Sequence, residues 1–84
     1  MELGEVFGLE YGLWEMAGGS MSDVEAEELF VVISGSATVT IHAANGFDGA
    51  VLELVPGSVC QLREGMHTSW VVHERLRKVY LARP

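Results

Sequence analysis

Short apolar runs separated by glycine-containing turns dominate the chain and predict strands. Runs rich in β-branched residues cover residues 28–34, 37–43, 50–55, 58–63, 68–73 and 77–82. A weaker candidate covers residues 11–16. Short strands that recur about every ten residues are typical of an antiparallel sandwich or barrel. Because no segment sustains a helical period, the pattern predicts an all-β fold.

Side-chain alternation predicts that the strand at 37–43 has one solvent-exposed face. Val39 and Ile41 point one way, whereas His42 and the two threonines point the other way. The histidine is therefore expected outside the core. This strand needs cover on only one side.

The run at 28–34 is apolar on both faces. Phe30 and Val32 share one face, and Leu29, Val31 and Ile33 share the opposite face. A strand of this kind must be covered on both sides, and a barrel core covers only one. We expect a second copy of the chain to cover the other face. The alternative is that residues 1–13 fold back over it.

Length and charge narrow the possible functions. The 84 residues fit one domain spanning 1–84, and 49% apolar residues exclude a disordered chain. The net charge of -7, with only 5 Lys and Arg residues, excludes nucleic-acid binding and disfavours an anionic membrane surface. No apolar run is long enough to span a membrane.

The single cysteine, Cys60, allows no intramolecular disulfide. This favours a reducing compartment, and we expect a cytoplasmic protein. Cys60 lies in an apolar-rich segment, so an inert thiol is expected, with a reactive thiol as the alternative.

Four pieces of the chain carry a family resemblance. They are "GLWEMAGG", the spacing of Glu28 and Gly35, "LELVPGSVCQLREGMHTSW" and, most specifically, "WVVHERLRKVYL". Over about residues 12–82 the chain resembles the cupins. The resemblance is closest to short single-domain cupins related to ureidoglycine aminohydrolases and EutQ-like proteins. It implies a small antiparallel, jelly-roll-like β-barrel that is often a dimer and has an interior pocket.

In metal-binding cupins, the resemblance implies a divalent metal held by two histidines and a glutamate of a first motif and by a histidine of a second motif. Glu28 matches the glutamate. The segment before it, "MSDVEA", contains no histidine, and we expect Asp23 and Glu25 there to be solvated. Glu28 is thus the one first-motif ligand that the chain keeps.

In the second motif the resemblance places the ligand histidine at Thr68, one residue after His67. Arg63 takes a proline position of that motif, and Gly65 is kept. A shift of one residue reverses the face of a strand. If Thr68 and Trp70 face the interior, then His67 and His73 face away. A bulge at residues 65–66 that turns His67 inward is the alternative.

We therefore expect no cofactor. Glu28 and His67 are only weak candidates for binding a divalent metal. The residues expected to line an interior pocket are Glu28, Phe30, Thr68, Trp70, Tyr80 and Arg63, with Trp14 as a further wall.

A carboxylate on an inward face needs a partner. Arg63, Arg77 and Lys78 are the candidates for Glu28. A structural ion pair is the plainer interpretation, and a ligand-orienting or general-base carboxylate is the sharper one.

The function that these patterns favour is a metal-free, homodimeric module that binds or senses a small molecule. A metal-dependent cupin enzyme of the lyase, isomerase or aminohydrolase type is the alternative that the resemblance implies. A third hypothesis is a regulatory interaction domain that uses the acidic surface around Glu25 and Glu27.

Overall fold

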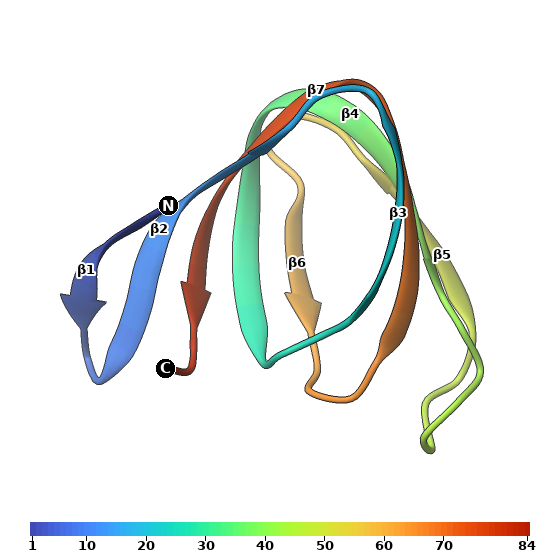
Figure 1. Ribbon diagram of the computed structural model, residues 1–84, viewed down its shortest axis with the longest axis horizontal. Coiled ribbons are helices and arrows are strands. Elements are labelled where there is room, and N and C mark those ends of the chain that lie inside the picture. The colour runs from blue at the N-terminus through green and yellow to red at the C-terminus, as the bar shows by residue number, and fades with distance from the viewer.

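Seven strands and no helix make up the computed structural model, which describes residues 1–84 (Figure 1). The strands are β1 (Glu2–Val6), β2 (Leu9–Met16), β3 (Gly19–Val24), β4 (Glu28–Ile41), β5 (Ala50–Leu54), β6 (Val59–Leu62) and β7 (His67–Ala82). Every pairing is antiparallel, as predicted. No helix that could cross a membrane is present.

The long strands β4 and β7 organise the sheet. They pair from Glu28↔Ala82 to Ile41↔Thr68, with register shifts between Val32 and Ala37. At these shifts both strands bend, and the sheet arches over onto itself (Figure 1). β2 and β3 follow each other along β7, and β5 and β6 follow each other along β4.

The bend divides the sheet into two legs. The first leg contains β1, β2, β6 and residues 28–32 and 76–82 of the long strands. The second leg contains β3, β5 and residues 37–41 and 67–72 of the long strands. The two legs are the facing halves of the bent sheet. The core lies between them.

The bend also explains why the strands are longer than predicted. The runs at 28–34 and 37–43 are two halves of β4, and those at 68–73 and 77–82 are two halves of β7. Gly35 lies at the bend with φ +86°, and a Cβ built there would lie 2.0 Å from the Arg75 carbonyl oxygen. Only glycine permits this approach of the two backbones.

β1 and β3 correspond to no predicted run. β3 has the polar sequence "GSMSDV" and only Met21 packs against the core. Its register with β7 is continuous from Gly19↔Val72 to Val24↔His67. Pairing with a long neighbouring strand, rather than β propensity, therefore decides its conformation.

The interior is filled by side chains from both legs. The buried apolar residues are Phe30, Val32, Ala37, Val39, Ile41, Leu54, Leu62, Trp70, Val72 and Leu76. Two crossing segments, 25–27 and 63–66, close the end opposite the bend. They are joined by backbone hydrogen bonds from Glu25 N to Met66 O (2.8 Å) and from Gly65 N to Glu25 O (2.9 Å).

The outer face of the first leg stays uncovered. Leu29, Val31 and Ile33 are 43%, 38% and 44% exposed. The alternative that residues 1–13 fold over this face is wrong. The free edge of β7 pairs with β2, and β2 pairs with β1, so the N-terminal segment widens the sheet. We call these three residues, with Leu13, Val59, Val79 and Leu81, the outer apolar face.

Candidate functional site

A buried ammonium group occupies the interior. Lys78, the only lysine of the chain, points inward from β7, and its side chain is 6% exposed. Its Nζ donates a hydrogen bond of 2.6 Å to Oε2 of Glu28, at the start of β4. A buried charge requires such a partner. Of the three cations considered for Glu28, the structure selects Lys78.

Three aromatic rings surround the same ammonium. Nζ of Lys78 lies 4.3 Å from the ring centroid of Phe30, 5.0 Å from that of Trp14 and 5.1 Å from that of Trp70. All three distances fall within the range of cation–π attraction, about 6 Å. We call Trp14, Phe30 and Trp70 the aromatic cage.

Register and bend assemble the cage from three strands. Trp14 of β2 lies directly opposite Lys78, and Phe30 comes from the other neighbour of β7. Trp70 belongs to the second-leg half of β7, and its ring contacts Trp14 and Phe30 of the first leg. The rings also contact one another, with centroids 5.9 Å apart for Trp14 and Trp70 and 6.1 Å apart for Phe30 and Trp70.

A second carboxylate, Glu25, turns inward beside the cage. It accepts hydrogen bonds from Thr68 Oγ1 at 2.6 Å and from Trp70 Nε1 at 3.2 Å. Burial raises the pKa of Glu25, while these two hydrogen bonds act in the opposite direction. Glu25 is thus an interior acid that shares its partners with the wall of the cage.

The prediction that Glu25 is solvated is wrong. The segment that carries it crosses the end of the barrel and is held by the backbone of Met66. One signal was available in the sequence. Met21, Asp23 and Glu25 alternate along one face, and the first two lie opposite Trp70 and Thr68. Asp23 itself remains exposed.

Glu25 gives the protein a pH-dependent contribution to stability. Its folded pKa is raised above the ordinary value of 4.5. The stability from the protonated acid is present below that value and is lost as the pH rises through the folded pKa. We therefore expect the melting temperature of Glu25→Gln, minus that of the wild type, to increase as the pH rises from about 4 to about 7. Asp23 and Lys78 face Glu25 in both proteins. Thermal unfolding across this range measures the difference, and a constant difference would contradict the assignment.

The other expected pocket residues divide into two groups. Phe30, Thr68 and Trp70 are each 1% exposed, so they fill the interior. Tyr80 faces the same side, where its ring lies against Gly12 and burial raises its pKa. Arg63 lies outside, with an exposed side chain paired to Glu27 at 3.5 Å.

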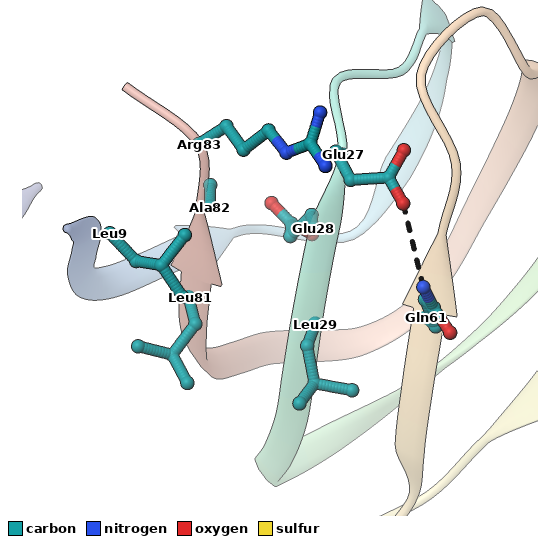
Figure 2. A pocket seen from close by; sticks show the side chains of 8 residues that line it. All are labelled: Leu9, Glu27, Glu28, Leu29, Gln61, Leu81, Ala82 and Arg83. Carbon is teal, nitrogen blue, oxygen red and sulfur yellow. Dashed lines mark hydrogen bonds between the residues drawn. The ribbon is translucent and has the colours of Figure 1, made fainter. Parts of the chain in front are cut away.

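The open space nearest to Glu28 is a depression of about 150 Å³ at the ends of the first-leg strands. It is lined by Leu9, Glu27, Glu28, Leu29, Gln61, Leu81, Ala82 and Arg83. Figure 2 shows Arg83 extending toward Glu27, which is hydrogen-bonded to Gln61. The depression is open to solvent and lies beside the Glu28 carboxylate.

All three histidines lie on the outer face of the second leg. His42 and Ser69 are joined by a hydrogen bond of 2.7 Å between Nε2 and Oγ, and His73 and Thr38 by one of 2.8 Å. His67 is exposed, and the pairing of β7 with β3 contains no bulge at this position. The alternative that His67 turns inward is therefore wrong.

These residues do not fit the metal centre of metal-binding cupins. Glu28 already binds an ammonium, Thr68 stands at the second-motif histidine position, and no histidine reaches the interior. No group of three histidine, cysteine, aspartate or glutamate side chains lies close enough together to hold a metal ion. Burial raises the pKa of the Cys60 thiol, so the thiol is protonated at neutral pH.

An antiparallel sheet folded over a filled interior, with the first-motif glutamate inside, defines a cupin barrel. The chain belongs to the family of EutQ-like cupin domains, whose model matches residues 3–80. The resemblance predicted from the sequence is confirmed. Among curated proteins, no sequence matches the chain.

Solved structures show the same fold. A protein of unknown function from Rhizobium leguminosarum superposes with a TM-score of 0.81 at 18% identity, over 100% of this chain and 78% of its own. A cupin superfamily protein from Desulfitobacterium hafniense gives 0.73 at 19%, over 98% and 72%. The EutQ protein of Clostridium difficile gives 0.73 at 22%, over 90% and 56%. At these identities the likeness shows the fold alone.

Proposed function

We propose that this protein is a metal-independent cupin module that binds a small molecule in the barrel and works as a homodimer in the cytoplasm. The observation that carries the proposal is the Lys78 ammonium, held by Glu28 inside the aromatic cage. A cation fixed there by the chain itself leaves no place for a divalent ion. A divalent ion on the same carboxylate would be repelled by the adjacent ammonium.

Metal analysis tests the first part of the proposal. Protein purified without a nickel column is expected to carry less than about 0.1 equivalent of any transition metal, because two or more good ligands are missing. Its melting temperature should not change when Fe, Mn, Ni or Zn is added. Near-stoichiometric metal, or a large stabilisation by one of these ions, would contradict metal independence.

The two other hypotheses receive less support. A metal-dependent enzyme needs ligands that the interior lacks. An interaction domain around Glu25 and Glu27 needs an acidic surface. Glu25 is turned inward, and Glu27 is engaged by Arg63 and by the backbone N–H of Glu64. The acidic surface is thus smaller than the sequence suggested.

The outer apolar face supports the homodimer. Val59, Val31, Val79 and Leu13 lie opposite one another in a single row across four strands of the first leg. A contiguous apolar surface of this kind on a small domain is typical of a protein interface. The chain's net charge of -7 opposes self-association, so an uncharged face is where a second copy can approach.

We expect Val31→Glu to convert the dimer to a folded monomer. Val31 lies at the centre of the row, and a buried unpaired carboxylate in the interface costs several kcal/mol. Val71→Glu is the matched control, because Val71 is similarly exposed but lies on the outer face of the second leg. Analytical ultracentrifugation at micromolar concentration measures both variants. A monomeric wild type, or a dimer that only V71E disrupts, would contradict this interface.

A further inference from the structure

The interior has the chemistry of a site for an organic ammonium ion. Its walls are the faces of three aromatic rings, which attract cations but offer no lone pairs to a metal. Its anionic end is Glu28, and Glu25 adds a second carboxylate nearby. Four of the chain's five cationic residues are arginines, and the lysine alone is buried.

The β1–β2 edge of the first leg, beside Tyr80, is also acidic. Glu2 and Glu5 of β1 lie opposite Gly12 and Glu10 of β2. Glu10 comes close enough to Glu2 that the repulsion between their carboxylates raises the pKa of Glu10. Both also act on Tyr80, whose pKa they raise further. A small cation thus meets a negative field on this side of the first leg, and an anion is repelled.

We propose that the barrel interior is a binding site for a small alkylammonium ion, and that Lys78 is its tethered, self-inhibiting occupant. This inference rests on the proposed function, since it names the ligand class of the same interior. An external amine binds by taking the place of the Lys78 ammonium against Glu28 and the three rings. Neutral and anionic molecules of the same size lack the charge that both features select.

The tether decides how the wild type behaves. Because the Lys78 side chain is attached to β7, its ammonium competes at an effective concentration of millimolar or higher. An external amine must first displace it. Millimolar amine is therefore expected to change the melting temperature of the wild type only slightly. Lys78→Ala removes three carbon atoms and the nitrogen, which together correspond to n-propylammonium. Removing the occupant should expose a cavity of matching shape.

Thermal unfolding of Lys78→Ala with n-propylammonium chloride tests the proposal. At a concentration about ten times the dissociation constant, the amine should raise the melting temperature of K78A by about 4 °C or more. Neutral 1-propanol and sodium chloride at the same concentrations should not. The wild type should shift by less than about 1 °C with the amine. No shift for K78A, or an equal shift with 1-propanol or sodium chloride, would overturn the proposal.

Two further variants keep the test decisive. If K78A is unfolded alone, amine-induced recovery of the circular dichroism spectrum is the supporting result, and failure to recover overturns the proposal. The double variant K78A/E28Q should lose most of the response to the amine, because the counter-charge is gone. Lys78→Met fills the cavity, so its melting temperature should not change when the amine is added. The metal analysis above is separate, so bound metal would refute metal independence while the amine response is judged by itself.

Discussion

Gly35→Ala is expected to unfold the domain or to remove most of its stability. The new Cβ would lie 2.0 Å from the carbonyl oxygen of Arg75 and 2.6 Å from its carbonyl carbon. Both are backbone atoms, so relief requires the two long strands to move apart at the bend. The left-handed φ of +86° adds strain of its own. We expect a loss of at least about 3 kcal/mol in the free energy of unfolding.

Gly57→Ala is the matched control. Gly57 has a φ of +91°, but a Cβ there would meet nothing within 4 Å. It should cost about 1 kcal/mol, which is the conformational strain alone. Urea unfolding of both variants separates the steric cost at the bend from the cost of φ. Equal losses would show that β4 and β7 do not approach each other closely at Gly35.

Glu28→Ala is expected to have the second largest effect. It leaves the Lys78 ammonium inside the barrel without its hydrogen-bonded carboxylate, and the remaining partners are the aromatic rings and the more distant Glu25. Removing one member of a buried ion pair typically costs about 3–5 kcal/mol. Glu28 keeps a side-chain exposure of 17%, so we expect the lower end of that range. Urea unfolding at neutral pH measures the loss.

The double variant Glu28→Leu with Lys78→Met should be more stable than Glu28→Ala. Replacing a buried pair by apolar side chains of similar size is often close to neutral, since no charge is left without a partner. Glu15→Ala is the exposed control. It removes a surface pairing with Arg75 and Arg77, and an exposed pairing of this kind contributes little to stability. A loss for Glu28→Ala no greater than that for Glu15→Ala would contradict a buried role for Glu28.

Much of the fold could be predicted because strand alternation reports directly which face is buried. The inward orientation of Thr68 and Trp70 and the outward orientation of His67 follow from a period of two once one residue is placed. The double apolar character of the run at 28–34 likewise predicted an apolar outer face that needs cover, and in the single chain that face is exposed. These are local properties of single strands.

The features that sequence reasoning missed depend on contacts between distant segments. β3 is a strand because β7 offers it an edge, and Glu25 is half-buried because the segment after β3 crosses the barrel end. Lys78 is one of three plausible partners for Glu28 until the register of β4 with β7 is known. The cage needs the bend as well, since Trp70 and Trp14 come from different legs.

The metal-free interior and the amine site both depend on the position of the Lys78 side chain. Because Lys78 is the only lysine, protein labelled with ¹³C-lysine gives one set of Hε–Cε signals in an NMR spectrum. Three rings at the distances above should move the Hε signal well upfield of its position in the unfolded chain. The signal should stay there when excess Zn²⁺ or Ni²⁺ is added. An Hε signal at the unfolded position, or one that a metal ion displaces, would contradict a barrel whose interior cation is its own lysine.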